Sequence, residues 1–287
     1  MLSLEHITKQ FRRHFYEKPF IALNDLSFNV VPGKITGFLG ANGAGKTTSI
    51  KIIMDLIRAD LGKVIFDQNL GNSRHAILSN VGYLPERPYF HPYLTGREFL
   101  QYMGSLQEMS NFRCNSAIAK WSKYLKIDFA IDRKINLYSK GMLQRLGIAS
   151  SLLHSPKLLI LDEPLSGLDP VGRKEIKDVI KKINSNGCTV FFSSHIVHDV
   201  EEICQDIIFI EKGKLVFQGP VNEILHINQN QNYEIELQDN DGTLSNFQLP
   251  ADERDSFLKK SLSEGKSVTI CRPVRQSLEE ILYHIKE

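Results

Sequence analysis

The feature that most constrains this chain is a glycine-rich octapeptide set between an apolar run and a helical pattern. Residues Gly40–Thr47 read Gly-Ala-Asn-Gly-Ala-Gly-Lys-Thr, and the run Ile35–Leu39 before them predicts a buried strand. Apolar residues after the octapeptide recur at helical spacing. Glycines let consecutive backbone N–H groups turn inward around a phosphate chain, and a helix N-terminus favours anions. An ordinary glycine turn is the alternative, but the flanking strand and helix favour phosphate binding.

The residues of this loop predict a nucleotide site. Lys46 is placed to reach the terminal phosphates, and the Thr47 hydroxyl is placed to bind Mg²⁺. By itself the loop leaves kinases, GTPases and ATPases open. The residues expected to surround the nucleotide are Asn42, Gly43, Ala44, Gly45, Lys46, Thr47 and Thr48.

Composition narrows the class of protein. The 287 residues suit one domain with a sizeable core plus an appendage, or two modest domains. A formal net charge of +2 calls for no nucleic-acid partner. The four cysteines lie far apart, which argues against a metal knuckle and fits a reducing cytosol. We expect neither a secretory signal nor a membrane-spanning run, so a membrane role would come through a partner.

Apolar runs predict an α/β fold with a mainly parallel sheet. The runs Lys157–Leu161 and Thr189–Phe192 are continuous and apolar, as in parallel strands that are covered on both faces. Between them, apolar residues at helical spacing from Ile176 to Ile183 predict a crossover helix. Near the start, Leu26–Val30 alternates in polarity and predicts a half-exposed antiparallel strand.

Two further segments differ from this pattern. Residues 87–135 begin with aromatic residues and prolines and continue as helices predicted for Gly96–Ser105 and Ser116–Leu125, which indicates a helical insertion. The C-terminal part alternates strand and helix patterns and ends in a helix predicted for Ser277–Ile285. The predicted domains are 1–224, with the insertion at about 87–135, and a small α+β appendage at 225–287.

A second group of candidate site residues follows the run that ends at Leu161. Asp162 and Glu163 lie at the carboxyl end of a predicted buried strand, which is the edge where open α/β sheets bind ligands. Asp162 suits a hold on Mg²⁺ through water, and Glu163 suits a general base that deprotonates a water in line with the γ-phosphate. The alternative is an acidic pair that caps the next helix.

The order of further motifs resembles that of ABC-type ATPases over roughly residues 1–220. Tyr138–Met142 resembles the signature segment of that family, Ser166–Asp169 its D-loop and Ser193–His195 its switch histidine, while Tyr83–Glu86 stands where the family has its Q-loop. The resemblance implies a P-loop NTPase core with a mainly parallel sheet, an antiparallel β subdomain and the helical insertion. It also implies that ATP and Mg²⁺ are the ligands and that the activity is ATP hydrolysis.

In the family that the chain resembles, two ATPase domains pair head to tail, and each signature segment closes over the nucleotide of the other. The resemblance implies that Ser139 and the Gly141 N–H contact the γ-phosphate that the partner's Lys46 holds. A helix predicted to begin near Gly141 supplies a physical reason, because its N-terminus favours anionic oxygens.

His195 and an aromatic ring complete the expected nucleotide site. A lone histidine after an apolar strand is more often a packing residue, but the family places its γ-phosphate sensor at the position of His195. Phe11 lies where the family has the ring that stacks on adenine, while Phe15 and Tyr16 are close alternatives on a lengthened loop. Core or surface packing remains an alternative for Phe11.

The chain departs from the family pattern at three positions. Glu86 stands where glutamine is usual; a carboxylate can accept a hydrogen bond from a metal-bound water but cannot donate one. Lys140 and Met142 replace a glycine and a glutamine of the signature segment, whereas Ser139 and Gly141 are present. Lys140 is either solvated or adds a positive charge near the nucleotide.

Three functions compete for such a chain: the ATPase subunit of a membrane transporter, a soluble ATPase that acts on ribosomes or DNA, and a regulatory module without hydrolysis. A single cassette without a heptad insertion disfavours the second function. The presence of Lys46, Asp162, Glu163 and His195 disfavours the third. The chain is therefore expected to drive separate permease subunits.

Within transporters, Pro85-Glu86, the Ser-Lys-Gly-Met signature and the ending Gln276–Ile281 look like ATPases of bacterial ABC-2-type exporters. The resemblance implies a homodimer beneath an integral-membrane permease, at the cytoplasmic face of the inner membrane. We expect the permease to dock in a groove lined by Tyr89–Tyr93, Phe99 and Tyr102. The alternative is that these rings pack the core of the insertion itself. The transported substrate is not encoded here, because the permease makes its pocket; an adjacent reading frame for a polytopic protein would identify the class.

Overall fold

The computed structural model describes residues 1–12, 18–227, 232–239 and 241–273 of the chain. The chain folds into two compact units, Met1–Pro220 and a second unit that begins at Val221. The sequence placed this boundary at residue 224. None of the helices in the described ranges is long and apolar enough to cross a membrane.

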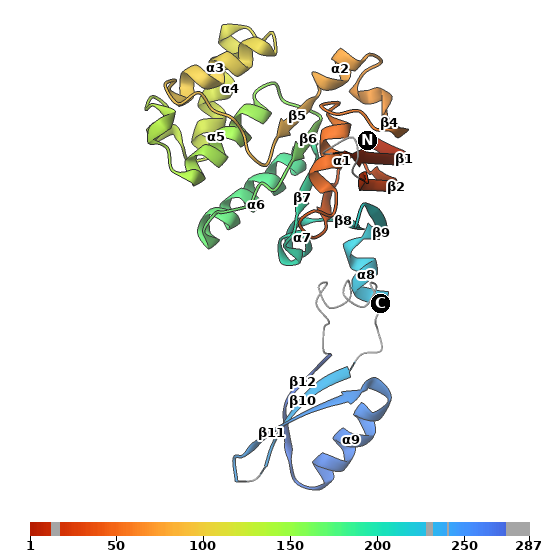
Figure 1. Cartoon of the computed structure of the whole chain (residues 1–287). Coiled ribbons are helices and arrows are strands. Elements are labelled where there is room, and N and C mark those ends of the chain that lie inside the picture. Colours follow the sequence, from red (N-terminus) through yellow and green to blue (C-terminus); the bar gives the residue numbers. More distant parts are fainter. Residues whose placement is uncertain (13–17, 228–231, 240, 274–287) are drawn as a thin grey trace. The chain divides into compact units, whose positions relative to one another are not determined.

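A six-stranded sheet with the order β5-β6-β7-β3-β8-β9 forms the centre of the first unit (Figure 1). Five of its strands, β3, β5, β6, β7 and β8, run parallel, and β9 is antiparallel to its neighbour β8. The predicted parallel sheet is therefore confirmed. The strands are β3 (Ile35–Leu39), β5 (Val81–Leu84), β6 (Leu158–Leu161), β7 (Thr189–Ser194), β8 (Asp206–Glu211) and β9 (Lys214–Pro220).

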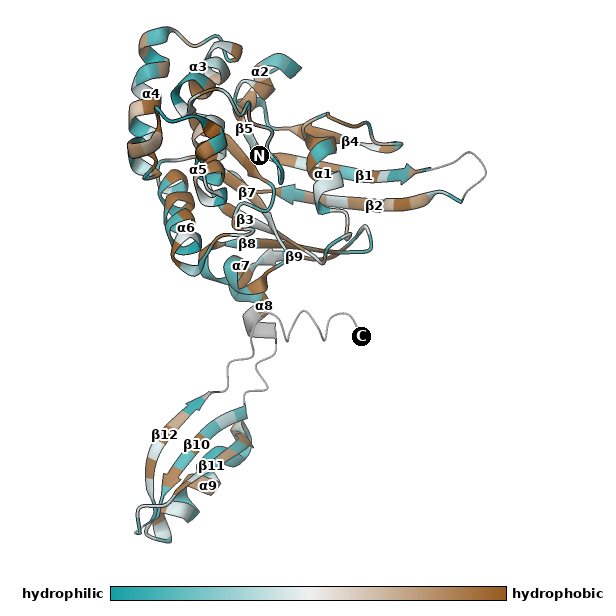
Figure 2. Cartoon of the chain, turned by 60° about the vertical axis from the view of Figure 1, so that its left-hand side comes forward, coloured by the Kyte–Doolittle hydropathy of each residue, from teal (hydrophilic) through white to brown (hydrophobic). Residues whose placement is uncertain are grey.

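The central strands of this sheet are buried because most of their side chains are apolar on both faces. Every residue of β3, β6 and β7 is buried, and Figure 2 shows hydrophobic residues concentrated on the strands. The helices of the unit outside the insertion are α1 (Lys46–Ile53), η1 (Gln68–Leu70), α2 (Arg74–Leu78), α5 (Lys140–Leu152), α6 (Pro170–Ser185) and α7 (Val197–Ile203). The crossover helix expected between β6 and β7 is α6.

A second, antiparallel sheet with the order β2-β1-β4 packs on the same core. Its strands are β1 (Leu2–Phe11), β2 (Phe20–Val30) and β4 (Leu61–Phe66). The Phe28 ring lies 5.3 Å from the Phe38 ring of β3 and 6.0 Å from the Phe191 ring of β7, measured between centroids. This aromatic cluster joins the two sheets, and β2 confirms the antiparallel strand predicted near the start.

The insertion between β5 and α5 is helical, as predicted. It contains α3 (Gly96–Leu106), α4 (Asn111–Tyr124), η2 (Asp128–Ala130) and η3 (Ile135–Leu137). Thr95 and Glu98 form a capping box at the start of α3. α4 begins earlier than the prediction of Ser116, because the Ser110 side chain accepts a hydrogen bond from the Arg113 N–H and caps the helix there.

In the described residues, the second unit contains α8 (Val221–Ile227), a three-stranded antiparallel sheet and one further helix. The sheet order is β11-β10-β12, and the Phe247 ring of β11 packs on the Phe257 ring of α9 at 4.9 Å. The helix predicted for Ser277–Ile285 lies outside the described residues. The elements are β10 (Asn232–Gln238), β11 (Leu244–Pro250), α9 (Ala251–Ser263) and β12 (Ser267–Pro273).

Candidate functional site

The glycine-rich loop connects β3 to α1, as the sequence predicts, and its backbone requires glycine. Gly43 and Gly45 have φ angles of 83° and 110°, a region that residues with a β-carbon rarely adopt. A β-carbon on Gly45 would lie 2.9 Å from the Ala22 carbonyl oxygen. The strand β2 therefore packs directly against the loop and fixes its shape.

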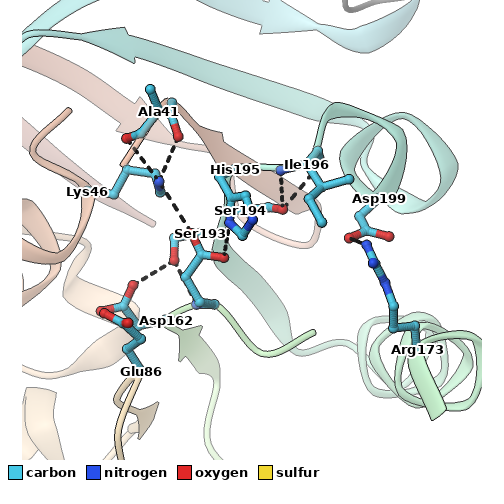
Figure 3. Close-up of polar contacts among 12 residues, drawn as sticks. Ala41, Lys46, Glu86, Asp162, Arg173, Ser193, Ser194, His195, Ile196 and Asp199 are labelled. Atoms are coloured by element: carbon cyan, nitrogen blue, oxygen red, sulfur yellow. Dashed lines mark hydrogen bonds and ion pairs between the residues drawn. The ribbon is translucent and has the colours of Figure 1, made fainter. Parts of the chain in front are cut away.

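Lys46 is the first residue of α1, and its ammonium group lies inside the loop. The side chain is only 6% exposed. Its Nζ donates a hydrogen bond of 2.6 Å to the Gly40 carbonyl and lies 3.3 Å from Glu163 Oε1. Figure 3 shows this ammonium directed at the carboxyl ends of the neighbouring strands. The cation is thus already placed where an anionic ligand would meet the loop.

Asp162 follows β6 directly and is fully buried. The Ser193 hydroxyl donates a hydrogen bond of 2.6 Å to its Oδ1. Its Oδ2 has no hydrogen-bond partner among the described residues. Burial raises the pKa of Asp162, and the nearby Glu86 and Glu163 carboxylates raise it further, against hydrogen bonds from Ser193 and Thr47. A buried carboxylate oxygen without a partner fits a site that a cation completes.

Glu163, the proposed base, is held in an unusual backbone conformation. Its φ angle is +51°, which costs a residue with a β-carbon about 1–2 kcal/mol. Its N–H donates to Ser193 Oγ at 2.8 Å, and its Oε2 lies 2.9 Å from His195 Nδ1. Ser193 therefore holds the Asp162 carboxylate and the Glu163 backbone, and His195 faces the Glu163 carboxylate rather than packing in the core.

A cavity of about 380 Å³ lies over these groups. It brings together residues of the loop with Glu86, Glu163 and His195, which the sequence predicted for one site. The predicted site residues Phe11, Ala44, Ser139, Gly141 and Asp162 are not among the described residues that line it. The lining is Phe20, Ala22, Ala41, Asn42, Gly43, Gly45, Lys46, Thr47, Thr48, Glu86, Glu163, Ser166 and His195.

An exposed ring does line this cavity, but it belongs to β2. Phe20 is 63% exposed and pairs in register with Phe11 on β1. Phe11 is 41% exposed and lies under the Lys9 ammonium, which is 5.5 Å from the ring centroid. The alternatives Phe15 and Tyr16 lie outside the described residues. The sequence singled out Phe11 and not Phe20, because Phe11 lies where the family has the ring that stacks on adenine.

The signature segment forms the start of α5, away from this cavity. Ser139 is exposed and is the N-cap of the helix, and its side chain accepts a hydrogen bond from the Met142 N–H at 3.3 Å. Lys140 is the first helical residue, so the helix begins one residue before the predicted Gly141. The segment thus presents a capped helix N-terminus that its own phosphate loop does not use.

The residues predicted to bind Mg²⁺ fit a divalent cation. The Thr47 side chain lies near enough to lower the pKa of Asp162, and the Glu86 carboxylate, which lies beside Asp162 in Figure 3, raises it. The Glu86 carboxylate also lies 3.9 Å from Arg87 Nε. Two carboxylates and a hydroxyl are oxygen ligands of the kind that Mg²⁺ prefers, with water in the remaining positions. No group of three or more His, Cys, Asp or Glu suited to a metal occurs in the described ranges.

Ion pairs anchor the segment after His195 to the helix that follows the D-loop. Asp199 on α7 is almost fully buried and pairs with Arg173 of α6 at 2.5 Å and with Lys177 at 3.6 Å. Asp169, the last residue of the D-loop, caps α6 by accepting from the Gly172 N–H. Asp169 and the segment after His195 are therefore both tied to α6, the first directly and the second through α7.

The predicted aromatic groove is partly wrong. Phe99 is only 5% exposed and belongs to the core of the insertion, and the half-buried Phe90 ring packs on it at 5.1 Å. Tyr89 and Tyr93 are 78% and 80% exposed. The helical period of α3 explains the error, because Phe99 lies on the buried face with Leu100 and Gly104, whereas Tyr102 lies outside that face and is 47% exposed.

Known proteins match both the sequence and the fold. The family model described as ABC transporter matches residues 23–166. The chain is 31% identical over 301 residues to an uncharacterised ABC transporter ATP-binding protein, YxlF of Bacillus subtilis (strain 168), and the match covers 98% of both chains. It is 36% identical over 226 residues to the bacitracin transport ATP-binding protein BcrA of Enterococcus faecalis, which is 78% of this chain and 70% of that protein.

Among solved structures, the dimeric post-hydrolysis state of the ATP-binding cassette MJ0796 bound to ADP and Pi has a TM-score of 0.69 and 23% identity. The match covers 77% of this chain and 99% of that chain. At this identity the match shows a shared fold.

Proposed function

The chain belongs to the ABC transporter ATP-binding family, whose members are ATPases, and we propose that it is the ATP-hydrolysing subunit of a bacterial ABC-2-type exporter. The proposal rests mainly on the separation of two phosphate-binding elements within one chain. The cavity over the phosphate loop contains Lys46, Glu163 and His195, whereas the exposed cap of α5 at Ser139 lies outside its lining. A second copy in head-to-tail orientation brings the missing element to each cavity.

The residues of the cavity have distinct roles in the proposed hydrolysis. Lys46 exchanges its contact with Glu163 for phosphate oxygens, which leaves the carboxylate free to accept a proton from the attacking water. His195 keeps that carboxylate oriented through its 2.9 Å contact. Phe20 offers an exposed ring to the base of the nucleotide, in place of the ring expected at Phe11.

Mg²⁺ is proposed as the second ligand, held by Thr47, Asp162 and Glu86. When bound, it would neutralise phosphate charge and supply the counter-charge that the buried Asp162 lacks. The third residue is the least constrained, because the Glu86 side chain is 45% exposed and has a contact to Arg87.

An integral-membrane permease is the proposed partner, so the chain would be peripheral to the cytoplasmic face of the membrane. Support comes from the family and from BcrA, which is a bacitracin transport protein. The exposed rings of Tyr89 and Tyr93 come a few residues after Glu86, so the proposed metal site and this surface are close in sequence.

The substitution Glu163→Gln tests the proposal, because it removes the base and the charge beside Lys46. We expect phosphate release to fall by about 10²–10⁴-fold while ATP binding persists. The variant should then elute as an ATP-dependent dimer in size-exclusion chromatography. Glu264→Gln, which changes an exposed carboxylate of the second unit, is the matched control. Turnover at the wild-type rate would refute the base assignment, and a monomer in saturating ATP would refute the head-to-tail dimer.

A further inference from the structure

Contacts from other segments are needed to keep the backbone turn at Glu163 in its observed conformation. A φ of +51° at a residue with a β-carbon persists only where surrounding contacts impose it. Inside the turn, the Ser166 N–H donates to the Glu163 carbonyl at 3.1 Å. From β7, Ser193 accepts from the Glu163 N–H. These two contacts hold the residue from inside the turn and from the sheet side.

The third contact comes from α5. Gln144 is buried, and its Nε2 donates a hydrogen bond of 2.8 Å to the carbonyl oxygen of Pro164, the residue that follows Glu163. A buried amide with a well-formed hydrogen bond fixes its acceptor, because breaking the bond would leave polar groups buried without partners. Gln144 therefore holds the turn from α5, whereas Ser193 holds it from β7.

α5 touches the same turn at two further places. A β-carbon built on Gly167 would overlap the ammonium end of Lys140, so the Lys140 side chain lies across the D-loop at a glycine with φ of +70°. A β-carbon on Gly141 would lie 3.6 Å from Leu168 Cδ2. The first turns of α5, which begins with the signature segment, and the turn after Glu163 thus form one packed unit inside a single chain.

We infer that Gln144 is a positioning residue that couples the signature helix to the Glu163 of its own chain. The inference rests on the proposed head-to-tail dimer, in which the signature segment of one chain contacts the nucleotide of the other. Through the Gln144 hydrogen bond to Pro164, the first turns of α5 hold the turn that aims the base of the same chain.

The variant Gln144→Met keeps the length of the side chain and removes the donor. We expect kcat to fall by about tenfold, since a misplaced base is costly even when all reacting groups are present. Binding of a fluorescent ATP analogue to the monomer should change by less than about twofold, because the phosphate loop is untouched. Ser151→Ala on the same helix is the control, since that buried hydroxyl donates only within α5, to Ile148.

Mixtures of variants decide which site Gln144 serves. Each composite site uses the Glu163 and His195 of one chain and the Ser139 of the other. Gln144→Met mixed with Ser139→Arg should regain activity, because one site then has an intact base and an intact signature. Gln144→Met mixed with His195→Ala should not, because both lesions then disable the base side. The opposite pattern would show that Gln144 serves its own signature segment and would overturn the inference.

Two controls keep this test decisive. Ser139→Arg mixed with His195→Ala should regain activity on its own; failure there refutes the proposed dimer, separately from the role of Gln144. Should Gln144→Met lose its circular dichroism signal, Gln144→Asn replaces it, because that amide is one methylene shorter and cannot reach Pro164. Wild-type kcat in a folded Gln144→Asn or Gln144→Met variant would overturn the inference.

Discussion

The carboxyl edge of the six-stranded sheet and the first turn of α5 are both expected to bind phosphate, yet they are built in different ways. At the sheet edge, Lys46 and Asp162 are buried and Glu163 is mostly covered, and all three are already in contact with one another or with Ser193. At the start of α5, Ser139 is exposed and its side chain caps only its own helix.

The difference teaches which part of the site one chain can build alone. Parallel strands bring their carboxyl ends to one edge, so the buried groups there are assembled by the fold of the core. The helix N-terminus is stable with its cap and needs no ligand for its own folding. The N-terminus of α5 can therefore bind a ligand that a second molecule holds, whereas the groups at the sheet edge act within their own chain.

Replacing Lys46 should have the largest effect of the predicted changes, because it removes the buried cation of the sheet edge. In Lys46→Ala, Glu163 also loses its charged neighbour at 3.3 Å. We expect nucleotide affinity and turnover both to fall by about 10²-fold or more, measured by fluorescent nucleotide titration and phosphate release. Lys51→Ala is the matched control, since it removes an exposed lysine from the same helix. Equal losses of affinity and turnover in Lys46→Ala and Lys51→Ala would mean that the sheet edge has no special role in nucleotide binding.

A mixture of Ser139→Arg and His195→Ala tests whether the two regions really serve different molecules. Each variant alone should bind nucleotide as a monomer but turn over slowly. With random pairing in a two-fold dimer, about a quarter of wild-type turnover should return, from one intact site in half of the dimers. The measurement is phosphate release against mixing ratio. A mixture as inactive as its parents, with dimers confirmed by light scattering, would place both elements in one site.

The smallest effect is expected where α5 is tied to α6. Glu175 pairs with Lys126 at 2.8 Å and with Arg145 at 2.5 Å, and hydrogen bonds from these two cations lower its pKa. Because the folded pKa lies below the ordinary value of 4.5, this stabilisation is present above pH 4.5 and is lost as the pH falls through the folded pKa. Glu175→Gln should lower the free energy of unfolding by about 1 kcal/mol at pH 7.

Urea unfolding of Glu175→Gln at a series of pH values checks this expectation, with Asp178→Asn, an exposed acid of the same helix, as the control. The difference from wild type should shrink below pH 4.5, and nucleotide affinity of the monomer should stay unchanged. A difference that is constant across the pH series would show that the ion pairs do not hold α5.

The sequence alone determined the family, the parallel sheet and the identity of the residues at the sheet edge. Gly40–Thr47 and the pair Asp162-Glu163 could be placed because short-range patterns specify a strand, a loop and a helix in that order. Strand ends then meet at one edge whatever the details of packing. These inferences need only local periodicity and the handedness of crossovers.

Only the tertiary structure decided how those residues are held. The register that pairs Leu161 with Phe192 brings the next residue of each strand, Asp162 and Ser193, side by side, and no local pattern specifies that register. The bond from Gln144 to Pro164 and the burial of Phe99 likewise depend on how helices pack against the sheet and on one another. Local sequence specifies which face of an element is apolar, but the partner that each polar atom meets is set by packing between segments far apart in the chain.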